Sequence, residues 1–60
     1  MCEARVYKTD NQCESKIMDD VYVLKKEDDK IYLLNIFGEQ EIVKANIKKI
    51  DFIAHKVILE

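Results

Sequence analysis

Residues 21–36 read VYVLKKEDDKIYLLNI, two apolar runs separated by charged residues. The runs at 21–24 and 31–36 are rich in β-branched and aromatic residues, which are the types most favoured in β-strands. The acidic residues between them have the side chains that favour a turn. The pattern predicts two consecutive strands with apolar residues on both faces, and therefore a β-rich fold.

The segment before this stretch carries the same type of signal. Cys2, Ala4 and Val6 alternate with more polar residues, which predicts a half-buried strand. Residues 9–12 read TDNQ and favour a turn. Residues 17–18 then predict a short return strand, interrupted by the two aspartates that follow it.

The segment after the stretch predicts further short strands. The only glycine, Gly38, marks a tight bend, and an apolar strand follows it at residues 41–45. Residues 57–59 predict the last strand. The part at 45–50 allows either a strand or a short 3₁₀ turn, because two of its isoleucines are spaced by three.

These signals together predict an all-β fold. We expect one domain over residues 1–60, because the chain has only 60 residues. About five to six short antiparallel strands with brief loops would close into a small barrel, since closure removes exposed sheet edges.

Composition and charge exclude several classes of function. The chain carries 12 acidic and 10 basic residues, for a formal net charge of −2, and the charges alternate in sign along it. This pattern indicates a solvated surface and makes nucleic acid an unexpected partner. No signal peptide or membrane-spanning run is visible, so we expect a cytoplasmic protein without membrane contact. The two cysteines do not make a disulfide framework.

The apolar content exceeds what one small barrel needs. Several large side chains compete for inward positions, and a strand with two apolar faces suggests that one face meets a partner. A second copy related by a two-fold axis is the simplest partner, so we expect a homodimer. The alternative is a well-filled monomer core with tyrosine hydroxyls at its rim. The competing residues are Tyr7, Tyr22, Leu24, Tyr32 and Leu34.

No set of residues in the sequence indicates catalysis. His55 is the only histidine and lies in a predicted turn, where a solvated side chain is the ordinary interpretation. Ser15 and Thr9 have no neighbouring base that would make either a nucleophile. We therefore expect a protein that is not an enzyme.

Cys2 is the candidate with the most specific chemistry. Removal of Met1 would leave the α-amine, the thiol and the Glu3 amide N–H within chelating distance, and metals displace such protons near neutral pH. Nitrogen and sulfur donors in one plane suit a square-planar ion such as Ni(II). The Glu3 carboxylate, a water or the terminus of a second copy could fill a remaining position. The competing interpretation is a small buried terminal cysteine, and Cys13 is a weaker donor candidate.

Three short motifs occur in an order that resembles one known family. They are MCEA at residues 1–4, IFGEQ at 36–40, and IDF at 50–52 followed by VIL at 57–59. Together they resemble the CooT-type small nickel-binding proteins over the whole chain. The resemblance implies a small Sm-like β-barrel, a homodimer, and Ni(II) bound through the cysteine after the initiator Met, here Cys2. It also implies a link to nickel delivery for carbon monoxide dehydrogenase, and members have been labelled predicted RNA-binding proteins.

The leading hypothesis is a cytoplasmic, homodimeric nickel(II)-binding protein that acts as a metallochaperone, a nickel store or a sensor. Its metal residues would be Cys2 and Glu3, and its partner would be a nickel enzyme under maturation. A small barrel that binds RNA and a module for protein interaction are the alternatives.

Overall fold

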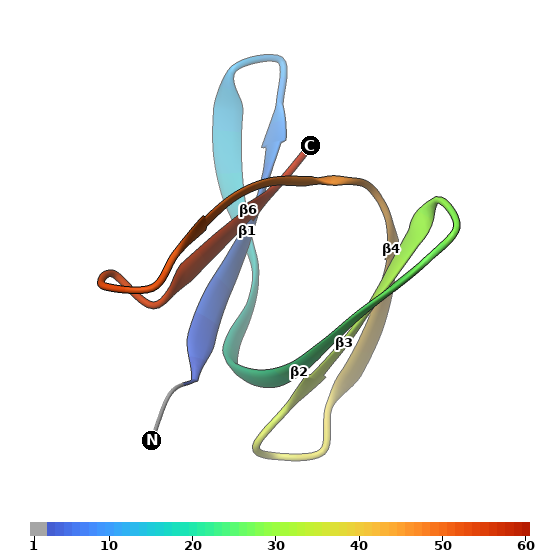
Figure 1. Ribbon diagram of the computed structural model, residues 1–60, viewed down its shortest axis with the longest axis vertical. Helices are drawn as coiled ribbons and strands as arrows, with labels where there is room; N and C mark the ends of the chain where they lie inside the picture. Colours follow the sequence, from blue (N-terminus) through green and yellow to red (C-terminus); the bar gives the residue numbers. More distant parts are fainter. Residues whose placement is uncertain (1–2) are drawn as a thin grey trace.

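The computed structural model describes residues 3–60, which form one six-stranded sheet without helices (Figure 1). The strand order across the sheet is β4-β3-β2-β1-β6-β5. The expectation of an all-β fold is confirmed. The strands are β1 (Ala4–Asp10), β2 (Cys13–Glu27), β3 (Lys30–Asn35), β4 (Gln40–Lys44), β5 (Ile47–Asp51) and β6 (Lys56–Leu59).

β2 is a single long strand of 15 residues, and the predicted interruption after residue 18 is wrong. Asp20 instead has a φ of 57°, and the pairing of β2 with β1 and with β3 shifts register around this position. Such a bulge bends a strand without ending it. The bend lets the first half of β2 pair with β1 and the second half with β3.

The β3–β4 connection is organised by Asn35, the one buried polar residue among those described. Its Oδ1 accepts hydrogen bonds from the backbone N–H groups of Phe37, at 3.0 Å, and Glu39, at 2.9 Å. Its Nδ2 donates to Glu39 Oε1 at 2.6 Å. Gly38 has a φ of +82°, a conformation that glycine adopts without steric cost.

The C-terminal strands complete the sheet in a way that the sequence did not predict. β6 pairs with β5 antiparallel but with β1 parallel, with Val57 opposite Val6. The expectation that all strands are antiparallel is therefore wrong for this pair. The possible 3₁₀ turn is also absent, because residues 47–50 belong to β5.

The sheet curves strongly but does not close into the predicted barrel (Figure 1). Within residues 3–60, β4 and β5 are the two edge strands and no strand pairing joins them. The two residues between these strands bond elsewhere: Ala45 N donates to Asp29 O at 3.0 Å, and Asn46 exchanges two backbone hydrogen bonds with Glu60, at 3.0 and 2.8 Å. The linker thus fixes the curvature while leaving both edges open.

The core draws on five of the six strands and the linker. The stretch 21–36 supplies Val21, Ile31 and Leu33 to the core. Along β3, buried residues alternate with half-buried ones. Tyr22 faces away from the core and is 58% exposed. The buried apolar residues are Val6, Met18, Val21, Ile31, Leu33, Ala45, Val57 and Leu59; β4 contributes Val43, which is partly buried against this cluster.

Candidate metal site beside the start of β1

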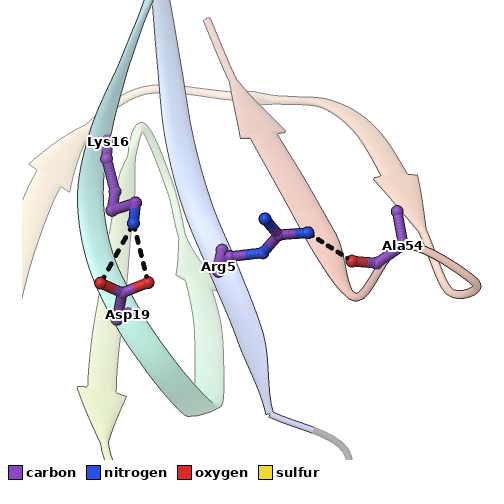
Figure 2. A network of polar contacts seen from close by, with 4 residues as sticks. All are labelled: Arg5, Lys16, Asp19 and Ala54. Atoms are coloured by element: carbon purple, nitrogen blue, oxygen red, sulfur yellow. Dashed lines mark hydrogen bonds and ion pairs between the residues drawn. The ribbon is translucent and has the colours of Figure 1, made fainter.

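The first residues of β1 are tied to the turn between β5 and β6. The Arg5 backbone N–H donates to the His55 carbonyl at 2.9 Å, as part of the parallel pairing that sets Arg5 opposite Lys56. The Arg5 guanidinium also reaches across and donates to the Ala54 carbonyl at 2.9 Å (Figure 2). On its other side, Ala4 pairs with Val21 of β2. The start of β1 is therefore held from both sides.

The turn that receives Arg5 is itself organised by Asp51. The Asp51 Oδ1 accepts hydrogen bonds from the backbone N–H groups of Ile53, at 3.1 Å, and Ala54, at 2.9 Å. The hydrogen bond from Ala54 is the largest cause that lowers the pKa of Asp51. Desolvation is the next largest and opposes it, and Lys49, Ile53 and Lys56 each lower the pKa further by smaller amounts. A charged Asp51 thus stabilises the turn.

A hollow of about 270 Å³ opens between the start of β1 and this turn. Glu3, Ala4 and His55 are among the residues that line it. The remaining lining is largely apolar, from β5, the turn and β6. These residues are Ile50, Asp51, Phe52, Lys56 and Val57.

The structure describes only one of the two residues that the sequence predicts to bind metal. Cys2 lies outside the described residues. Glu3 is half-buried at the hollow. Within residues 3–60, no group of three or more His, Cys, Asp or Glu side chains could hold a metal ion.

The weaker donor candidate lies far from Glu3. Cys13 is exposed at the start of β2, opposite Asp10 at the tip of the β1–β2 hairpin. Glu14 next to it forms an ion pair with Lys56 at 2.9 Å, and the Lys56 ammonium also lies 4.7 Å from the centre of the Tyr7 ring. Glu14, Lys56 and Tyr7 form a surface contact between strands, and among residues 3–60 the Cys13 thiol belongs to no group of side chains that could hold a metal ion.

His55 lies in a turn and its side chain is exposed, as the sequence predicted. The structure adds that His55 lies beside the start of β1 and lines the same hollow as Glu3. This neighbourhood depends on the parallel pairing of β1 with β6. No signal in the sequence indicates that pairing, because residues 5 and 56 are distant along the chain.

Comparison with known proteins identifies the family of this chain. The model of a family described as "CO dehydrogenase accessory protein CooT" matches residues 1–60. The chain belongs to the CooT family. A crystal structure of a CooT candidate from Carboxydothermus hydrogenoformans has a TM-score of 0.91 and 30% identity, over 98% of this chain and 95% of that one. An uncharacterised protein of Methanocaldococcus jannaschii is 34% identical over 44 residues, which is 73% of this chain and 77% of the relative.

Membership of the CooT family confirms the resemblance seen in the three short motifs. The family consists of accessory proteins of CO dehydrogenase and not of enzymes, which agrees with the expectation that this chain is not an enzyme. In residues 3–60 no helix long and apolar enough to cross a bilayer is found.

The surface near the CooT motifs is unusually apolar. Phe52 and Ile53 at the β5–β6 turn are 83% and 94% exposed. Phe37 in the IFGEQ motif is 71% exposed, beside the half-exposed Ile36. Within residues 3–60, both turns therefore leave large apolar side chains open to solvent.

Proposed function

We propose that this protein binds Ni(II) as cargo through Cys2 and takes part in the maturation of a nickel enzyme such as CO dehydrogenase. The match of the CooT family model to residues 1–60 is the observation that carries this proposal. The Met1-Cys2 start of the sequence supplies the metal chemistry. The cytoplasm, where such enzymes are assembled, is the compartment that we propose.

The donor chemistry fits a nickel ion at the start of the chain. After removal of Met1, the Cys2 amine, the Cys2 thiolate and the deprotonated Glu3 amide nitrogen supply three donors, which match the preference of square-planar Ni(II). The adjacent hollow leaves space beside Glu3, and the contacts of Arg5 fix where the strand begins. One terminus supplies only three of the four donors, so the fourth comes from another group.

We also propose that the protein is a homodimer. Eight large apolar side chains of residues 3–60 are at least one-third exposed, and none of them is needed for the core of the single chain. Several lie close to the start of β1 in the fold, so a dimer interface would cover the region of the metal site. The curved sheet and its bonded linker are compatible with the Sm-like fold that the family resemblance implies. The net charge of −2 does not favour RNA as a partner.

A nickel titration tests the proposal. Protein whose Met1 has been removed, as shown by its intact mass, is titrated with Ni(II) while the thiolate-to-nickel absorption is recorded. We expect a saturable absorption that Cys2→Ala abolishes and that Cys13→Ala leaves unchanged. A protein that retains Met1 should bind more weakly, because its α-amine then belongs to Met1, one residue before Cys2. Equal titrations for the unchanged protein and Cys2→Ala would refute the role of Cys2.

A further inference from the structure

We propose that the open edge of β4 accepts an extended segment of a partner protein as an additional strand of the sheet. The partner segment places an apolar residue opposite Ile42 and a basic residue opposite Glu41. This inference goes beyond the proposed function and uses no part of the metal site. An accessory protein acts on another protein, and the β4 edge offers a surface for that contact.

The backbone of β4 has hydrogen-bonding groups that face away from the sheet. The Asn35 N–H donates to the Glu39 carbonyl at 3.1 Å, and the Ala45 N–H donates to the Asp29 carbonyl at 3.0 Å. Both pairs continue the register of β3 with β4, along which hydrogen-bonded pairs alternate with non-hydrogen-bonded pairs. The odd-numbered residues of β4 therefore bond to β3. The N–H and C=O groups on the other side, where no strand of residues 3–60 lies, belong to Gln40, Ile42 and Lys44.

The edge of β4 is also less protected than the other open edge of the sheet. β4 pairs with β3 without a register shift, Ile42 at its centre is 67% exposed, and its single lysine lies at the end of the strand. The other edge strand, β5, has a register shift between Ile47 and Lys49 and carries two exposed lysines, Lys48 and Lys49. Bulges and lysines discourage the addition of a further strand. This contrast assigns strand addition to β4 and not to β5.

An apolar residue of the partner fits opposite Ile42. Tyr32 lies opposite Ile42 in the register, so the two side chains share one face of the sheet. Both line a hollow of about 400 Å³. Its other lining residues are the charged residues Lys25, Glu27, Asp28, Asp29 and Lys30 of the β2–β3 hairpin. Because apolar cross-strand pairs stabilise a sheet, Ile42 favours an apolar neighbour on the added strand.

A basic residue of the partner fits opposite Glu41. Successive residues of a strand point to opposite faces, so Glu41 lies on the other face from Ile42. Glu41 lines a second hollow, of about 580 Å³, together with the carboxylates of Asp19, Asp20 and Glu39. The one basic residue of this hollow, Lys16, is paired with Asp19 at 3.1 Å (Figure 2). The excess of negative charge is complementary to a basic side chain.

A synthetic peptide is the probe for this edge. In antiparallel pairing with β4 it places arginine, an apolar residue and glutamate opposite Glu41, Ile42 and Lys44. Amide hydrogen exchange of nickel-free, ¹⁵N-labelled protein is measured with and without the peptide. In the free protein, the amides of Gln40, Ile42 and Lys44 should exchange faster than those of Glu41 and Val43, because they have no strand partner. Saturating peptide should protect these three amides.

Two variants of Ile42 block the edge in different ways. Ile42→Pro removes the central N–H, and proline is tolerated in an edge strand where the N–H faces solvent. Ile42→Lys keeps the N–H and places a charge at the centre of the edge. Each variant should weaken peptide binding about tenfold or more. Ile47→Lys on β5 is the matched control and should leave binding unchanged. Circular dichroism shows whether each variant is folded.

Glu41→Lys tests the charge assigned to the partner. A second peptide has its arginine and glutamate exchanged. The unchanged protein should prefer the first peptide, whereas Glu41→Lys should prefer the second. Equal binding of both peptides by the unchanged protein would overturn the basic residue that the proposal assigns to the partner.

Three results would overturn strand addition at β4. They are absence of peptide binding, protection of amides in β5 instead of β4, and equal binding by the folded Ile42→Lys variant. Protection of the β4 amides that rises with protein concentration, without peptide, would assign the edge to a second copy and also overturn the proposal. Each of these results leaves the proposed function standing, because the nickel titration tests nickel binding through Cys2 separately.

Discussion

At the scale of single residues, the side chains of Asn35 and Asp51 organise the two turns that carry exposed apolar residues. In each case the side-chain Oδ1 atom accepts hydrogen bonds from two backbone N–H groups of the turn. The bend at Gly38 can be read from the sequence. The burial of Asn35 cannot, because it depends on strands that cover it from elsewhere in the chain.

Asn35→Ala should lower the free energy of unfolding by about 1–3 kcal/mol, since it removes one donor and one acceptor that together make three hydrogen bonds. Urea denaturation measures this change. Glu39→Gln is the matched control, because it keeps an oxygen for Asn35 Nδ2 and should cost less than about 0.5 kcal/mol. Equal stability of Asn35→Ala and the unchanged protein would contradict the role of Asn35.

The lowered pKa of Asp51 predicts a pH dependence of stability. Because its pKa in the folded chain lies below the ordinary value of 3.8, the charged form stabilises the fold fully above that value. This contribution is lost as the pH falls through the lowered pKa. Asp51→Asn keeps the acceptor oxygen but cannot titrate. The unchanged protein should therefore be more stable than Asp51→Asn at about pH 6, and the difference should shrink towards about pH 2.5 in thermal unfolding. A difference that stays constant with pH would argue against this effect.

At the scale of elements, the sequence predicted most strands but not how they pair. The apolar runs at 21–24 and 31–36 do form neighbouring strands, since their turn is local and lies between them. β2 is longer than expected because a bulge at Asp20 absorbs the polar residues without breaking the strand. The parallel pair of β1 and β6 joins distant parts of the chain, and local patterns carry no information on such a pair.

β3 should be the element most sensitive to loss of apolar volume. Leu33 is fully buried, so Leu33→Ala should cost about 2–5 kcal/mol. A single core of this size supplies about 3–5 kcal/mol, so much of the variant should be unfolded at room temperature. Ile42→Ala on the neighbouring β4 should change stability by less than about 0.5 kcal/mol, because Ile42 is 67% exposed. Circular dichroism in urea compares the two variants, and similar losses in both would contradict this placement of the core.

At the scale of the whole molecule, the apolar surface near the start of β1 predicts self-association. We expect sedimentation velocity to show a dimer, and Phe52→Ser with Ile53→Ser to shift it towards monomer. These side chains are 83% and 94% exposed, so the double variant should fold normally. Ile42→Ser is the matched control, since it removes an exposed apolar residue on the opposite edge strand.

Two results would count against a dimer that forms through Phe52 and Ile53. A monomer at every concentration would refute the association itself. A dimer that tolerates Phe52→Ser with Ile53→Ser but not Ile42→Ser would move the interface to the β4 edge of the sheet.

Fold and site thus differ in how far the sequence determines them. The family motifs identified the CooT resemblance without any structure, and the role of Cys2 as a metal ligand stays a prediction. The hollow that Glu3 and His55 both line is a property of the folded chain, because the β1–β6 pair brings these two residues together.

Native mass spectrometry of the protein with one equivalent of Ni(II) tests the central claim most directly, because it reads the state of the N-terminus, the bound metal and the number of chains together. The account predicts that chains lacking Met1 carry nickel and that Cys2→Ala chains do not. Nickel bound equally to Cys2→Ala, or a Met-free chain that takes up no nickel, would contradict it.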